Sequence, residues 1–188
     1  MKRHAALLIA LLLCIPPAVA AGSGDIVVDA AASRIGFTLR TRWGRSLEGR
    51  FPDHSGEVRL LVDGRKQVHL RLSARTVEIV DHPRYSRLTR GEGFFDAEHH
   101  PEVTFVSEAF APALVREGGE LAGVLDIRGV QRRELFEIAP ATCERPMIDC
   151  PVLVTGSVRR ADYAMDRWAF ALSERVQFHL SLRGTPLP

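Results

Sequence analysis

Apolar and polar residues alternate along most of the chain, which is the period of a β-strand whose two faces meet different surroundings. Eight runs follow this pattern, at 35–39, 47–51, 58–62, 68–72, 103–105, 121–127, 152–154 and 176–182. In the last and clearest run, every second residue from Val176 to Leu182 is apolar and the residues between are polar. Turn residues separate the runs, and Asp63-Gly64 is a strong hairpin signal.

These runs predict an all-β protein, an antiparallel β-barrel of about eight strands, because closing the sheet removes its exposed edges. Helices are expected to be few and short. Residues 83–90 are expected to form one, beginning near Asp81 and ending at Gly91, and residues 160–171 another turn or two.

Phenylalanine is the main aromatic residue, with nine copies against two each of Trp and Tyr. Several of these rings fall on the apolar side of the expected strands. An eight-stranded barrel has an interior that its side chains fill, or that holds one small ligand. Periodicity alone does not distinguish the two, and an ordinary solid core is the simpler interpretation.

The first 20 residues have the form of a secretory signal peptide. Lys2 and Arg3 precede an apolar run, residues 5–15, that is shorter than the roughly 20 residues of a membrane-spanning helix. We expect cleavage after Ala20, loss of Cys14 with the leader, and export to the periplasm or beyond. Residues 21–188 then form a single domain with no stable membrane insertion.

Loss of the leader removes two basic residues and leaves 23 basic and 23 acidic ones, a formal net charge of zero. This balance gives no support for electrostatic binding to nucleic acid. A homodimer is left open by the sequence.

Two cysteines remain, Cys143 and Cys150, and a closely spaced pair in an oxidising compartment predicts a disulfide. A metal site there would need more ligands than Glu144 and Asp149. Elsewhere His99 and His100 are adjacent, so a regular strand would point them to opposite faces. We therefore expect no metal site.

A series of ordered motifs runs along the mature chain and distinguishes it from a generic β-barrel. The motifs are Ser33 with Phe37, Gly49-Arg50-Phe51, Ser73-Ala74-Arg75-Thr76, Phe94-Phe95-Asp96, the stretch 101–107 with Pro101, Thr104, Phe105 and Ser107, the stretch 123–130 with Leu125, Ile127, Arg128 and Gly129, and the segment 160–165 with Arg160, Asp162 and Met165. In this series the chain resembles the YceI-like family of periplasmic proteins.

The resemblance implies a lipocalin-like antiparallel barrel that binds a long apolar chain, such as a polyisoprenoid or isoprenoid quinone, and performs no catalysis. No cofactor is implied beyond such a bound lipid. The residues expected to line the cavity are Phe37, Phe51, Phe94, Phe95, Phe105, Leu125 and Phe178.

Arg42 and Trp43 are further candidates, at the expected end of a strand. A guanidinium group binds phosphate in a fork geometry, so Arg42 could meet an anionic lipid head. A solvated turn is the alternative. Family members often carry a histidine shortly after the first-strand phenylalanine, and residues 38–43 hold none, which leaves the head-group contacts and the identity of the lipid open.

Two other classes of function remain as alternatives. One is an interaction or stress-related module with a solid core and no ligand. The other is a hydrolase using Ser107 with a distant histidine and Asp96, although the chain has no Gly-x-Ser-x-Gly motif.

Overall fold

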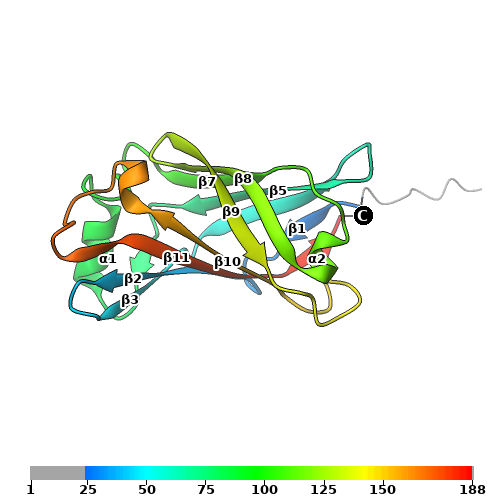
Figure 1. The fold of residues 1–188 in the computed structure, drawn as a ribbon, viewed down its shortest axis with the longest axis horizontal. Helices are drawn as coiled ribbons and strands as arrows, with labels where there is room; N and C mark the ends of the chain where they lie inside the picture. The colour runs from blue at the N-terminus through cyan, green and yellow to red at the C-terminus, as the bar shows by residue number, and fades with distance from the viewer. Residues whose placement is uncertain (1–23, 188) are drawn as a thin grey trace, which may run out of the picture.

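A computed structural model describes residues 24–187, so the predicted signal peptide and Cys14 lie outside the described residues. One antiparallel sheet makes up most of the molecule (Figure 1). Its strands are β1 (Ile26–Val28), β2 (Arg34–Thr41), β3 (Ser46–Arg50), β4 (His54–Leu60), β5 (Lys66–Ser73), β6 (Glu78–Ile79), β7 (Glu102–Ser107), β8 (Gly119–Ile127), β9 (Val130–Ile138), β10 (Val152–Arg159), β11 (Leu172–Leu182) and β12 (Gly184–Pro186).

The strands follow the order β12-β1-β4-β5-β7-β8-β9-β10-β11-β2-β3-β6, and the sheet curls into an elongated half-barrel. The predicted all-β, antiparallel, barrel-like fold is confirmed. Its two edge strands, β12 and β6, are three and two residues long. Such short edges leave few unpaired backbone groups for another chain to pair with.

Each of the eight predicted runs overlaps a strand, but the sheet has twelve strands rather than about eight. Three of the additional strands, β1, β6 and β12, are too short to show an alternation. The fourth, β9, does not alternate between apolar and polar residues in its first half, because Gln131 to Glu134 are all polar and largely exposed.

The β8–β9 hairpin explains the Ile-Arg-Gly-Val motif. Ile127 pairs with Val130, so only two residues form the turn. Both of them, Arg128 and Gly129, have positive φ, 57° and 74°. A two-residue turn with positive φ at both positions matches the twist of the strands that it joins.

Two short α-helices lie at opposite ends of the half-barrel (Figure 1). The predicted helix is confirmed as α1 (Pro83–Arg90), with His82 rather than Asp81 at its N-cap. It is anchored to β6 through Ser86, whose Oγ accepts a hydrogen bond of 2.9 Å from the Ile79 N–H. The helix α2 (Leu114–Glu117) was not predicted, and of residues 160–171 only Arg160–Tyr163 are helical, as the 3₁₀ turn η1.

Candidate functional site

Two apolar cavities lie inside the half-barrel, each of about 410 Å³. The first, here the α1 cavity, lies between β2, β3, α1 and the segment from η1 to β11. The second, the α2 cavity, lies between the central strands, α2 and the loop that holds the two cysteines. Volumes in this range are typical of sites for small organic ligands.

Apolar side chains line the α1 cavity almost throughout. Phe37 and Leu39 come from β2, Phe94 and Phe95 follow α1, and Met165 follows η1. Alternation on β2 directs Phe37 and Leu39 to the same inner face of the sheet. The wall therefore combines side chains from segments far apart in the sequence.

Arg160 holds one side of the α1 cavity in place. Its side chain is buried and donates hydrogen bonds to three carbonyl oxygens, those of Met165 (2.6 Å), Ser173 (3.0 Å) and Arg167 (3.2 Å). Burial lowers the pKa of the Arg160 guanidinium. These bonds fix the path of residues 164–173, which carry Trp168 and Phe170 to the cavity mouth.

Tyr163, in the same motif as Arg160, is fully buried. Its hydroxyl donates a hydrogen bond of 2.8 Å to Glu134 on β9. Burial is the main cause that raises the pKa of Tyr163, and the Glu134 hydrogen bond adds to it. The Tyr163–Glu134 pair thus ties η1 to the sheet.

The loop 143–150 forms part of the wall of the α2 cavity. Glu144 to Ile148 line it, together with residues of α2 and with Phe105, Leu125, Phe136 and Val154 from the sheet. The predicted Cys143–Cys150 disulfide is confirmed. Arg145 and Asp149 form an ion pair within the same loop, with the shortest N–O distance 2.7 Å. The disulfide therefore constrains a segment that forms part of the cavity wall.

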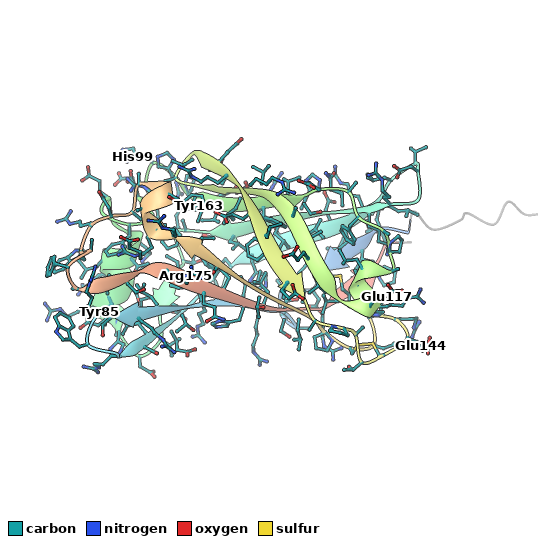
Figure 2. The ribbon with its side chains drawn as sticks, viewed as in Figure 1. Tyr85, His99, Glu117, Glu144, Tyr163 and Arg175 are labelled. Atoms are coloured by element: carbon teal, nitrogen blue, oxygen red, sulfur yellow. A yellow bond between two sulfur atoms is a disulfide. The ribbon has the colours of Figure 1, made fainter. Side chains whose placement is uncertain are left out.

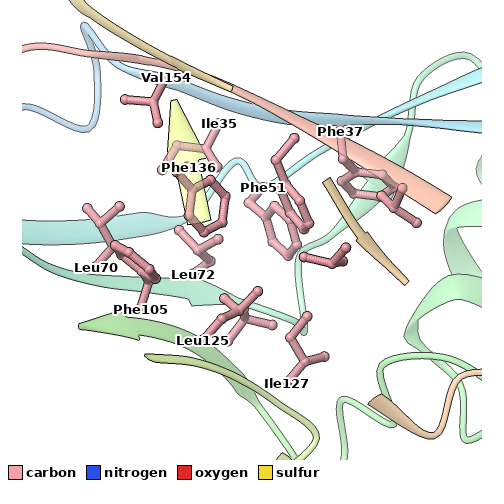
Figure 3. Close-up of a cluster of buried hydrophobic side chains, with 14 of the residues drawn as sticks. Ile35, Phe37, Phe51, Leu70, Leu72, Phe105, Leu125, Ile127, Phe136 and Val154 are labelled. Carbon is pink, nitrogen blue, oxygen red and sulfur yellow. The ribbon is translucent and has the colours of Figure 1, made fainter. Parts of the chain in front are cut away.

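A row of phenylalanine rings runs through the buried core from one cavity to the other, and Figure 3 shows Phe105, Phe136, Phe37 and Phe51 of this row. Six rings form consecutive contacts with centroid distances of 5.0 to 6.4 Å, namely Phe105, Phe136, Phe178, Phe37, Phe51 and Phe95. Phe178 is in the middle of the row and is the one residue that borders both cavities. Phe178 therefore lies between the two cavities.

Glycines on neighbouring strands make room for these rings. Gly49 on β3 pairs with Phe37 on β2, and Gly156 on β10 pairs with Phe136 on β9. A Cβ atom at either glycine would collide with the ring of its partner. The rings therefore lie flat over the glycine backbone, as aromatic residues do across strand glycines.

Most of the predicted ligand-binding residues border a cavity. Trp43, Phe37, Phe94 and Phe95 line the α1 cavity, Phe105 and Leu125 line the α2 cavity, and Phe178 borders both. Phe51 borders neither; it is only 1% exposed and packs between Phe37 and Phe95.

Arg42 does not line either cavity. Its side-chain Nε donates a hydrogen bond of 3.0 Å to the carbonyl oxygen of Ala169. Its backbone N–H donates one of 2.9 Å to the carbonyl oxygen of Ala171. Arg42 therefore joins the β2–β3 turn to the segment before β11. Arg45, in the same turn, does line the α1 cavity.

Sequence reasoning missed several residues of the two cavities. Phe136 was missed with its strand, and Met147 because nothing in the sequence places the disulfide loop against the sheet. Trp168 and Phe170 were missed because they lie outside any alternating run. One signal could have indicated them, because Trp168 and Phe170 are large aromatic residues in a segment, residues 166–171, whose other members are small or charged.

Ser107 is not arranged as a nucleophile. Its side chain is 2% exposed, and the one hydrogen bond of its Oγ within the described chain comes from the Val68 N–H, at 2.9 Å. Asp96 pairs with His99 at 2.9 Å, on an exposed turn. This pairing raises the pKa of His99 and lowers that of Asp96.

Among residues 24–187, no three His, Cys, Asp or Glu side chains gather closely enough to hold a metal ion. No helix within the same range is long and apolar enough to cross a membrane.

A model of the YceI-like domain matches residues 27–183. No curated protein matches the chain significantly. Among solved structures, BcnA of Burkholderia cenocepacia aligns with a TM-score of 0.68 and 20% identity, covering 82% of this chain and 98% of that one. A polyisoprenoid binding domain from Saccharophagus degradans, implicated in plant cell wall breakdown, aligns with a TM-score of 0.64 and 17% identity. This alignment covers 88% of this chain and 99% of that one.

A YceI protein of Campylobacter jejuni aligns with a TM-score of 0.55 and 18% identity, covering 73% of this chain and 84% of that one. At identities of 17 to 20%, these structural alignments show that the proteins share a fold.

Proposed function

Because the chain belongs to the YceI-like family, we propose that it is an exported periplasmic protein that holds a long apolar chain, such as a polyisoprenoid, inside its sheet without catalysing a reaction on it. The observation that carries this proposal is the pair of apolar cavities on either side of Phe178. Burial of each methylene group contributes about 0.8 kcal/mol. A long chain therefore binds without directional contacts, although ordering it offsets part of the gain.

The polar head of the ligand lies at the mouth of the α1 cavity in this proposal. Arg45, Trp43 and His82 border that cavity and provide a cation, a large aromatic surface and a polar ring. The chain extends inward past Phe37 and Phe95 to Phe178. A chain longer than the α1 cavity displaces the Phe178 ring and continues into the α2 cavity.

Two further observations support the proposal. The name of the Saccharophagus degradans domain describes polyisoprenoid binding by a protein of the same fold. The disulfide between Cys143 and Cys150 is of a kind that persists in oxidising compartments, which agrees with export.

Two Phe→Trp variants separate a hollow interior from a solid core. Phe105 borders the α2 cavity, so Phe105→Trp is expected to fill space, reduce uptake of a long polyprenol and change the free energy of unfolding little. Phe51 borders neither cavity, and Phe51→Trp is expected to cost about 1–3 kcal/mol through overpacking. Urea unfolding and binding of a radiolabelled polyprenol measure the two effects.

Equal destabilisation by both variants, with no polyprenol uptake by the unmodified protein, would favour the alternative of an interaction module with a solid core. Turnover of an ester substrate that Ser107→Ala abolishes would favour the hydrolase.

A further inference from the structure

Large apolar side chains surround the mouth of the α1 cavity and are exposed to solvent. They are Trp43 (74% exposed), Phe170 (73%), Leu88 (52%), Tyr85 (47%) and Trp168 (41%). Every exposed large aromatic side chain of the described residues is in this group. A cluster of this kind on a protein surface marks an interaction site.

Three chain segments present these side chains, and together we call them the α1 face: residues 40–46, 81–93 and 166–171. They lie at one end of the half-barrel, where Figure 2 shows Tyr85, and α2 lies at the other. Trp168 adopts a positive φ of 65°, uncommon for a bulky residue, and packs on Phe170 with ring centroids 5.6 Å apart. Both tryptophans of the protein are on this face.

The α1 face is also strongly basic. Its three segments contain seven arginines and three acidic residues, a formal net charge of +4, whereas residues 21–188 as a whole have a formal net charge of zero. The helix α1 carries three of these arginines, Arg84, Arg87 and Arg90, and no acidic residue.

The arginines of the α1 face are not neutralised by neighbouring carboxylates. None of the seven forms an ion pair within the described part of the chain, whereas six arginines elsewhere pair with Asp or Glu. Six of the seven are exposed, and Arg90 is half-buried. Two of the guanidinium groups donate hydrogen bonds to backbone carbonyls, that of Arg42 to Ala169 and that of Arg90 to Arg75. The other five are available to phosphate groups outside the protein.

We propose that the α1 face docks on the surface of an anionic phospholipid membrane. Trp and Tyr side chains prefer the boundary between lipid head groups and acyl chains, and arginines are attracted to anionic head groups. Docking in this orientation places the mouth of the α1 cavity against the bilayer, where an apolar chain passes between membrane and protein without crossing water. The protein binds the membrane peripherally and inserts no transmembrane segment.

Vesicle flotation and tryptophan fluorescence test this proposal directly. The vesicles contain phosphatidylglycerol and phosphatidylcholine, or phosphatidylcholine alone, and no isoprenoid, so the result does not depend on which chain fills the cavities. We expect binding to the anionic vesicles that weakens with added salt. We also expect a blue shift of the emission, quenched by bromine on the acyl chains, because Trp43 and Trp168 are the only tryptophans.

A matched pair of double variants tests the role of the arginines. Arg84→Gln with Arg87→Gln removes two exposed charges from α1, and we expect vesicle partitioning to fall roughly fivefold for each. Arg34→Gln with Arg71→Gln removes two exposed charges from strands outside the α1 face, and we expect partitioning to remain unchanged. Neither pair lines the α1 cavity or the α2 cavity, so polyprenol uptake from detergent solution is expected to be the same in all three proteins.

The proposal is overturned if the protein does not bind anionic vesicles, if it binds neutral vesicles equally well, or if the two double variants lose the same amount of binding. Saturable binding of a protein partner through the α1 face, in the absence of vesicle binding, would also overturn it.

Discussion

Replacing Phe178 with alanine should join the two cavities and extend the range of chain lengths that the protein binds. In a close-packed core, Phe→Ala costs about 3–5 kcal/mol. The Phe178 ring borders empty space on two sides and contacts the rings of Phe37 and Phe136 at centroid distances of 6.1 and 6.4 Å. A ring beside empty space has fewer contacts to lose than a ring packed on all sides. We therefore expect Phe178→Ala to lower the free energy of unfolding by about 2–3 kcal/mol.

The assay measures affinity against chain length for geraniol, farnesol, geranylgeraniol and a longer polyprenol. Each buried methylene contributes about 0.8 kcal/mol, roughly fourfold in the dissociation constant. In the unmodified protein the gain per carbon should decrease once the α1 cavity is full, because a longer chain must displace Phe178. In Phe178→Ala the gain should continue into the α2 cavity.

Phe51→Ala is the matched control, because Phe51 is buried beside Phe37 and borders neither cavity. Phe51→Ala should lower the free energy of unfolding by about 3–5 kcal/mol and leave the dependence of affinity on chain length unchanged. The reasoning is refuted if Phe178→Ala and Phe51→Ala destabilise equally, or if Phe178→Ala has the chain-length dependence of the unmodified protein.

Three further predictions concern individual contacts. Gly49→Ala should cost about 1–3 kcal/mol in urea unfolding, because its new Cβ displaces the Phe37 ring; an unchanged midpoint would contradict the packing. Cys143→Ser should cost about 2–3 kcal/mol and speed the release of polyprenol by loosening the wall of the α2 cavity, which stopped-flow displacement measures. NMR titration should give His99 a pKa above its ordinary 6.5 that returns to it in Asp96→Asn. The stabilisation from this pair should be complete between pH 3.8 and pH 6.5. It should disappear as the pH rises through the raised pKa of His99 or falls through the lowered pKa of Asp96. An identical His99 titration in Asp96→Asn would contradict the pairing.

Much of the fold could be predicted because alternation determines which face of a strand is apolar. The run 176–182 became the inner face of β11, with Val176, Phe178 and Leu182 buried. The strand β9 could not be predicted in this way, because its first half lies in solvent on both faces and only Phe136 and Ile138 are buried. Strands of two or three residues depend on tertiary pairing and leave no local pattern.

The inward direction of the predicted site residues could be read from the sequence, but whether they enclose space could not. Phe51 and Phe105 occupy equivalent positions in their alternating runs, yet Phe105 borders a cavity and Phe51 fills a solid layer. That difference depends on which side chains the curled sheet brings opposite each ring. At the cavity mouth the sequence indicated Trp43 but not Trp168 and Phe170, because these two are in an irregular segment whose path is set by Arg160.

Mass spectrometry of an organic extract is the most direct test of the claim that the interior holds an apolar chain. The protein is purified under native conditions with its leader processed, and its extract is compared with that of the same host lacking the protein. The account predicts a polyprenyl or other long-chain lipid in near-stoichiometric amount, retained by the control variant Arg34→Gln and reduced in Phe105→Trp. A clean extract, together with no uptake of added polyprenol, would contradict it.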